Sequence, residues 1–173
     1  GGKLVIYAEP KGGLRDKNLV GSAEMTDFRV VKAPTLARLL SIMSLPGLSS
    51  ALNGEGLGFS KLEASFDWLF RQQGSLLVLK DGRTSGNSLG LTFDGTFDNA
   101  AGMLDVKGTI IPLAGVNEII GNIPIVGDII TGGTGALIAA TYSLTGNSEE
   151  PEVSVNPLSV LTPGILRRIL FQN

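Results

Sequence analysis

The sequence predicts a mainly β fold: a curved antiparallel sheet or groove (a β-taco or a partly closed sandwich) with two helical hairpin inserts and a C-terminal helix. Three observations lead to this prediction. Apolar and polar residues alternate along several segments. An apolar segment with two prolines occurs twice, and the 173 residues include 24 glycines, which are common at strand ends and turns. A chain of this length is expected to form one domain spanning residues 1–173.

Strict alternation marks the strands, because successive side chains of a strand point to opposite faces of a sheet. It is clearest in residues 61–70 and recurs in 88–97, 103–111 and 137–144, and further strand-like sequence lies at Leu4–Ala8 and Val20–Val31. Two hairpin turns are predicted, one at Asp81-Gly82 and one across residues 97–102. These segments are typical of half-buried antiparallel strands.

Two segments with matching proline positions interrupt the alternation. Pro34 and Pro46 recur as Pro112 and Pro124 at the same offset, which gives an internal pseudo-repeat at about 34–54 and 112–132. Proline at a helix start, apolar residues at helical spacing and a closing glycine predict helices at 34–43 and 47–52. The second copy predicts helices at 113–120 and 126–130. A last helix is predicted from Asn156, as its cap, to Phe171.

Composition excludes several classes of function. The chain has no cysteine and no histidine, which removes thiol nucleophiles, Ser-His triads and most zinc sites. Net charge is −2 and basic residues do not cluster, so no nucleic-acid partner is expected. The glycine-rich segments at 54–58 and 132–135 lack the Lys-Ser/Thr of a phosphate-binding loop. We expect no enzyme activity, no cofactor and no metal.

The chain is apolar for a soluble domain, with 43% hydrophobic and 17% charged residues. Burial, lipid contact or a covered face has to account for the missing charge. The uncharged segment from Ile129 to Ser148 reaches the length of a membrane span, but its glycines, threonines and alternation argue against one.

Several motifs resemble the late part of the bacterial AsmA-like family, especially its YhdP-like subgroup. The strongest resemblance is the ending from Val153 to Gly164. The others are Phe28–Leu40, Leu52–Gly56, Gly108–Pro112 and Ile123–Asp128, so that the resemblance covers most of the chain from about Gly21 onward.

The resemblance implies that this chain is a fragment of a large envelope protein. That protein would be anchored in the inner membrane by an N-terminal helix and would extend a β-sheet groove with an apolar lining across the periplasm. It implies movement of phospholipid between the inner and outer membranes and a role in outer-membrane homeostasis. The implied partners are phospholipid or another acyl-chain ligand, an outer-membrane or envelope protein, and the rest of the same chain N-terminal to this fragment. The family has no catalytic motif.

One face of the predicted strands supplies candidate lipid-contacting residues: Phe66, Trp68, Leu89, Leu91, Phe93, Val106 and Tyr142. Hydrocarbon chains could take the place of a missing second layer there, since apolar burial needs no polar signature. Alternating apolar residues also form ordinary closed cores, so the alternative is a structural or protein-interaction module of an envelope assembly.

The predicted helical inserts are too apolar to lie free in solvent. Their candidate residues, which plug the groove or face a membrane, are Leu36, Leu39, Leu40, Met43, Ile119, Ile120, Ile125, Val126, Ile129 and Ile130. Because a strongly basic face is missing, packing against the sheet is favoured over electrostatic attachment to lipid.

Overall fold

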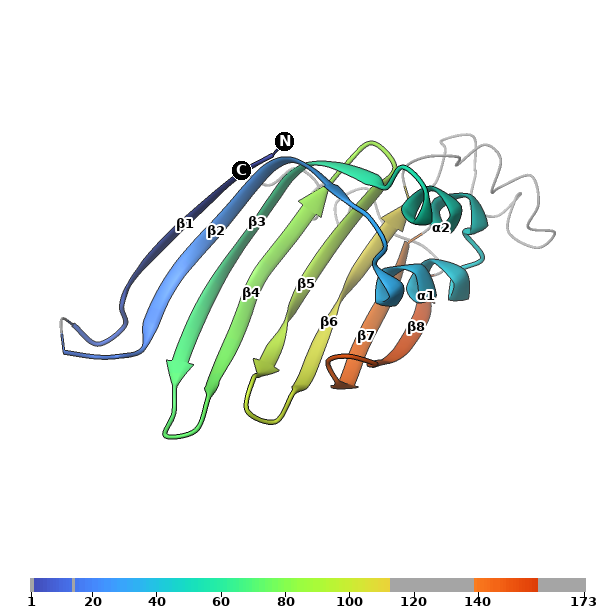
Figure 1. Cartoon of the computed structure of the whole chain (residues 1–173). Coiled ribbons are helices and arrows are strands. Elements are labelled where there is room, and N and C mark those ends of the chain that lie inside the picture. Colours follow the sequence, from blue (N-terminus) through green and yellow to red (C-terminus); the bar gives the residue numbers. More distant parts are fainter. Residues whose placement is uncertain (1, 14, 113–138, 159–173) are drawn as a thin grey trace.

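Within the described residues the protein, seen here in a computed structural model, forms one antiparallel sheet of eight strands (Figure 1). The structure describes residues 2–13, 15–112 and 139–158. Strands follow one another as neighbours in chain order, so the sheet is a simple meander with β1 and β8 at its edges. Within these residues the sheet neither closes nor curls on itself, so the curved groove or partly closed sandwich that the sequence predicts is not observed: β1 and β8 stay at opposite edges and do not pair. The strands are β1 (Lys3–Pro10), β2 (Leu19–Val30), β3 (Leu57–Phe70), β4 (Ser75–Ser85), β5 (Leu89–Asp98), β6 (Met103–Pro112), β7 (Ala139–Asn147) and β8 (Glu152–Leu158).

Two helices are inserted between β2 and β3. They are α1 (Pro34–Ile42) and α2 (Pro46–Asn53), each beginning at a proline as the sequence predicts. Ser44, with a positive φ of 57°, separates them, and Gly56, with a φ of 85°, follows α2 and donates its N–H to the Ala51 carbonyl at 2.8 Å. This hairpin crosses one end of the sheet (Figure 1).

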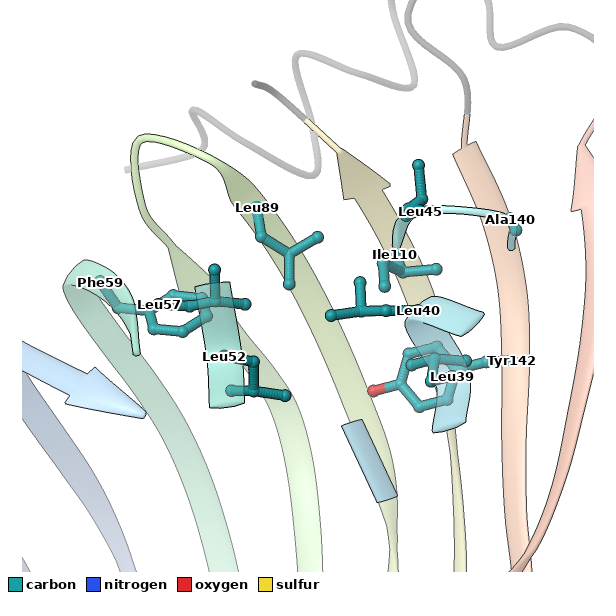
Figure 2. Packing of buried hydrophobic residues seen from close by; sticks show 10 residues of the cluster. All are labelled: Leu39, Leu40, Leu45, Leu52, Leu57, Phe59, Leu89, Ile110, Ala140 and Tyr142. Carbon is teal, nitrogen blue, oxygen red and sulfur yellow. The ribbon is translucent and has the colours of Figure 1, made fainter. Parts of the chain in front are cut away.

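The main core forms where the hairpin meets the sheet (Figure 2). Leu39, Leu40 and Leu52 project from the helices onto residues of β3, β5, β6 and β7, and Leu40 and Leu52 are completely buried. Asp27, with a φ of 51°, interrupts the alternation of β2 just before this region. Beyond it Phe28 packs against the core and stacks on Phe59, with ring centroids 5.3 Å apart.

The prediction of a mainly β antiparallel fold with a helical insert is confirmed, and three finer predictions need comment. Asp81-Gly82 is not a hairpin turn: it lies inside β4, where Asp81 adopts a φ of 52° and the pairing with β3 and β5 shifts register. This is a β-bulge, and Arg71–Gly74 makes the turn before β4 instead.

The expected C-terminal helix does not begin at Asn156, because residues 152–158 form β8 and pair with β7. Val153 and Val155 of this strand pack against the core, and this burial favours the extended conformation there. The remainder of that predicted helix, and the second helical insert with its pseudo-repeat partner, lie outside the described residues.

Candidate functional site: an uncharged face of the sheet

The two faces of the sheet differ sharply in chemistry. Residues directly opposite one another on neighbouring strands project from the same face, so the pairing register traces each face across the sheet. One row crosses all eight strands and consists of Ala8, Gly21, Phe66, Leu79, Gly95, Val106, Leu144 and Val153.

Two parallel rows have the same character. One contains Leu4, Met25, Leu62, Thr84, Leu91, Ile110 and Ala140, and the other contains Pro10, Leu19, Trp68, Leu77, Phe97, Leu104 and Gly146. None of the three rows contains a charged residue. We call the surface made by these rows, together with the residues between them, the apolar face.

The opposite surface, here called the polar face, holds the charges. A row on this side reads Glu9, Val20, Asp67, Val78, Thr96, Asp105, Thr145 and Glu152. Every ion pair within the described residues uses a carboxylate of this face: Glu63, Asp67 or Asp98. The charged residues that the sequence places in strands are therefore segregated from the apolar face.

Asp67 is the most enclosed of these carboxylates, with 8% of its side chain exposed. Lys11 lies 2.6 Å and Lys80 2.8 Å from the same carboxylate oxygen. The hydrogen bond from Lys11, followed by that from Lys80, holds the pKa of Asp67 below its ordinary value. These contacts tie the β1–β2 turn, β3 and β4 together, so they have a structural role.

Aromatic rings lie flat across the apolar face because glycine stands beside them. A β carbon on Gly82 would meet the Phe93 ring at 2.2 Å, and one on Gly21 would meet the Phe66 ring at 2.8 Å. At Gly108, the cross-strand partner of Tyr142, an added β carbon would meet the hydroxyl oxygen of Tyr142 at 3.0 Å. Aromatic side chains thus occupy the space beside these glycines on the apolar face.

The helices cover only part of the apolar face. Leu89 and Tyr142 lie beneath them in the core (Figure 2), and Leu91 packs against that core. Away from the helices Trp68 is 41% and Ile6 60% exposed, and Phe93 and Val106 are half-buried. The sheet thus presents a covered end and an end that the described helices leave uncovered.

All seven predicted lipid-contacting residues lie on this one face. Leu89, Leu91 and Tyr142 belong to the helix-covered end, and Phe66 is buried among its neighbours on the sheet. Trp68, Phe93 and Val106 are the members that a ligand could reach in the described structure. Residues that the sequence did not single out, including Leu4, Ile6, Leu77 and Phe97, extend the same surface.

Of the predicted helical residues, Leu39 and Leu40 of α1 lie in the core between the helices and the sheet, and Leu36 of α1 and Met43, the residue after α1, pack against that core. The other six, Ile119, Ile120, Ile125, Val126, Ile129 and Ile130, lie outside the described residues. In the part of the chain that the structure describes, no helix has the length and hydropathy to cross a bilayer, and no acidic cluster suits a metal ion.

Tyr142 brings a polar atom, its hydroxyl oxygen, into the covered end. Its hydroxyl donates a hydrogen bond to the backbone carbonyl of Thr92 at 2.9 Å. Burial, with a smaller contribution from the Asp94 charge, raises the pKa of Tyr142 to about 12. The hydroxyl is therefore neutral and satisfied at physiological pH, which suits a structural hydrogen bond and not proton transfer.

Comparisons with protein-family models, curated proteins and solved structures found no match for this chain. The asymmetry of the sheet and the sequence motifs are therefore the features of this chain that bear on its function.

Proposed function

We propose that this chain is a lipid-binding module, and that the apolar face holds the hydrocarbon tails of phospholipid. The observation that carries the proposal is the separation of the two faces: three rows of paired residues lack charge on one side, and the ion pairs gather on the other. A surface of this kind favours hydrocarbon over a charged or hydrogen-bonding substrate.

The energetics of hydrocarbon burial suit such a face. Each methylene group withdrawn from water contributes about 0.8 kcal/mol, so an acyl chain laid across several strands is held without any specific polar contact. The ligand can also shift along the surface, because no residue of the three rows fixes one position by charge. This supports transfer, in which the lipid has to be held and still move.

The place of the module follows from the sequence motifs described above. We propose that it forms the late part of an AsmA-like envelope protein, lies in the periplasm, and belongs to a longer chain anchored in the inner membrane. In that longer protein the open sheet would bend into a groove and the α1–α2 hairpin would close one end. Phospholipid passing between the two membranes is the proposed cargo.

A second function is favoured by the packing of α1 and α2. These helices already cover Leu89 and Tyr142, so the chain's own residues can occupy the apolar face. If other parts of the chain cover the remainder in the same way, the domain is a structural or protein-interaction module with a closed core.

Photocrosslinking distinguishes the two functions. A photoreactive phenylalanine analogue is placed at Phe93 on the apolar face, and at Thr96 on the polar face of the same strand as the matched control. The lipid proposal predicts that phospholipid from the producing bacterium is attached at position 93 and not at 96, as measured by mass spectrometry. If the analogue at position 93 crosslinks only to other segments of the same protein, the result would favour the structural or protein-interaction module with a closed core.

A further inference from the structure

A pocket lies where the α1–α2 hairpin returns to the sheet. Its volume is about 490 Å³, which falls within the usual size range of sites for small organic ligands. The walls come from the end of β2, from α2, from the start of β3 and from the turn between β4 and β5. The lining of this pocket combines apolar side chains with two charges.

The apolar part of the lining is aromatic and aliphatic. Phe28 and Phe59 stack with their ring centroids 5.3 Å apart, and Leu57 lies two residues before Phe59 on β3 (Figure 2). Leu48 of α2 contributes to the same lining. Side chains of this kind favour the hydrocarbon part of a ligand over a ligand that is polar throughout.

The two charges, on Asp27 and Arg29, have opposite sign. Both side chains are exposed, and neither takes part in an ion pair among the residues that the structure describes. Nη1 of Arg29 donates to the carbonyl oxygens of Glu55 and Gly56, at 3.1 and 3.3 Å, which holds the guanidinium beside the end of α2. The other guanidinium nitrogens keep N–H groups that a ligand can use.

Asp27 has an unusual backbone conformation for a residue in a strand. Its φ of 51° lies in the left-handed region, although Thr26 and Phe28 on either side of it both pair with β3. Such strain often accompanies a functional position. Aspartate and asparagine tolerate this conformation better than most residues, so Asp27→Asn removes the charge without a new demand on the backbone.

The pocket begins where the apolar face ends on β2 and β3. Met25 and Leu62 are the pair of an uncharged row that lies closest to the hairpin on these strands. Asp27 and Ser60, which both line the pocket, are two positions further along. A ligand with its tails on the apolar face could therefore place its polar end in the pocket.

We propose that this pocket binds the headgroup of a zwitterionic phospholipid, with the phosphate on Arg29 and a primary ammonium group on Asp27. The proposal rests on the lipid-binding function proposed above and adds the class of lipid. Two unpaired charges of opposite sign favour a ligand that carries both, because a simple anion would be attracted by Arg29 and repelled by Asp27. Phosphatidylethanolamine has this headgroup, whereas phosphatidylglycerol lacks the cation.

The pocket would give the lipid a defined position at one end of the apolar face. The three uncharged rows hold acyl chains without fixing them, whereas Asp27 and Arg29 set the place of the headgroup. The glycerol backbone and the first methylene groups would lie against Phe28 and Leu57. Ser60 and Asn87 offer uncharged hydrogen-bonding groups to the ester and phosphate oxygens.

Titration of the isotope-labelled chain with short-chain phospholipids, followed by NMR, tests the choice of headgroup. The amide signals of Gly58 and Asn87 report on the pocket, and those of Phe93 and Val106 report on the apolar face. Phosphatidylethanolamine should shift the pocket signals saturably and bind more tightly than phosphatidylglycerol. Soluble phosphoethanolamine, which carries the same charges without tails, should bind roughly tenfold more weakly or worse, because it cannot use the apolar lining.

Neutral substitutions separate the roles of the two charges. Asp27→Asn should weaken phosphatidylethanolamine by roughly tenfold, the usual effect of losing a charged hydrogen bond, and should not weaken phosphatidylglycerol. Arg29→Gln should weaken both lipids to a similar extent, because both carry the phosphate. Arg15→Gln and Asp105→Asn, at exposed positions outside the pocket, are the matched controls and should change neither affinity.

A second substitution at Arg29 separates ligand binding from its contacts with the carbonyls of Glu55 and Gly56. Arg29→Lys keeps the positive charge but loses the fork of donors. It should therefore bind both lipids more tightly than Arg29→Gln does. If the lysine and glutamine variants bind equally weakly, Arg29 acts only by holding the end of α2, and its assignment to the phosphate is wrong.

Three further results would overturn the proposal: equal affinity of the parent chain for the two lipids, a preference that survives Asp27→Asn, or phosphoethanolamine that binds as tightly as the lipid. If lipid still crosslinks at position 93 in these cases, the lipid-binding function stands and only the headgroup site is wrong. Failure of the parent chain to crosslink lipid at position 93 would instead count against the lipid-binding function itself. The two proposals therefore fail separately.

Discussion

Phe66 of β3 lies over Gly21, its cross-strand partner on β2. A β carbon built at Gly21 would approach the Phe66 ring to 2.8 Å and the Tyr7 carbonyl oxygen to 2.1 Å. The glycine thus lets the ring lie flat and lets β1 approach β2 closely. This contact links the edge of the sheet to the middle of the apolar face.

Gly21→Ala should therefore destabilise the protein by about 1–3 kcal/mol, the usual cost of forcing extra volume into a packed position. Gly58→Ala on β3 is the control, because nothing lies within 4 Å of the β carbon it would add. Urea unfolding of both variants measures the difference. Equal stability of the two variants would show that Phe66 moves away at little cost.

Much of the strand pattern could be predicted from the sequence because the polar face is charged. Lys61, Glu63 and Asp67 alternate with Leu62 and Phe66, so both the strand and its faces are visible. Strand β4 lacks this contrast: Leu76 to Leu79 are apolar on both faces, and the Asp81 bulge then changes the alternation. Periodicity alone could not identify that strand.

The candidate site was predicted in composition but not in extent. Alternation placed Phe66, Phe93 and Tyr142 on one face of their own strands, yet only the register shows that these faces are joined into one surface. The sequence could not show which part the α1–α2 hairpin covers. That depends on how the hairpin folds back after Val30, a long-range arrangement with no local signal.

Substitutions in α1 test how firmly the hairpin covers the sheet. Leu40 is fully buried, so Leu40→Ala should lower the free energy of unfolding by about 2–5 kcal/mol. Ile42→Ala, at a half-exposed position of the same helix, should cost less than about 1 kcal/mol. Chemical denaturation gives both values. A small effect at Leu40 would mean that the helix detaches from the sheet without opening its core.

Because Asp67 has a lowered pKa in the folded protein, we expect the free energy of unfolding to fall in acid. Its pKa is lowered in the folded protein, first by Lys11 and then by Lys80, so its stabilising effect is present above the ordinary value of 3.8 and disappears as pH falls through the lowered value. Asp67→Asn should thus be less stable than the parent at neutral pH, with the difference shrinking in acid. Asp105→Asn, an exposed position on the polar face, is the control. Unfolding curves from pH 7 to about pH 2 test this, and a difference independent of pH would contradict it.

Tyr142 has a raised pKa, so we expect the opposite pH dependence: its contribution to the free energy of unfolding should fall in alkali. Its folded pKa of about 12 exceeds the ordinary value of 10.0, so the neutral hydroxyl stabilises the fold fully below pH 10 and less as pH rises toward 12. The shift corresponds to about 2–3 kcal/mol at the alkaline limit. Tyr142→Phe should lose the hydrogen bond to Thr92 but escape this decline, so its stability should approach that of the parent as pH rises.

The chain contains only two tyrosines, which makes the same titration visible by ultraviolet absorbance. Tyr7 is 61% exposed and lies at the edge of the sheet, so Tyr7→Phe leaves the buried tyrosine as the only absorbing phenol. In that variant phenolate should form near pH 12, or together with unfolding if the sheet opens first. Phenolate appearing near pH 10 while the fold persists would show that the hydroxyl of Tyr142 reaches water, and that the helix-covered end of the apolar face is open.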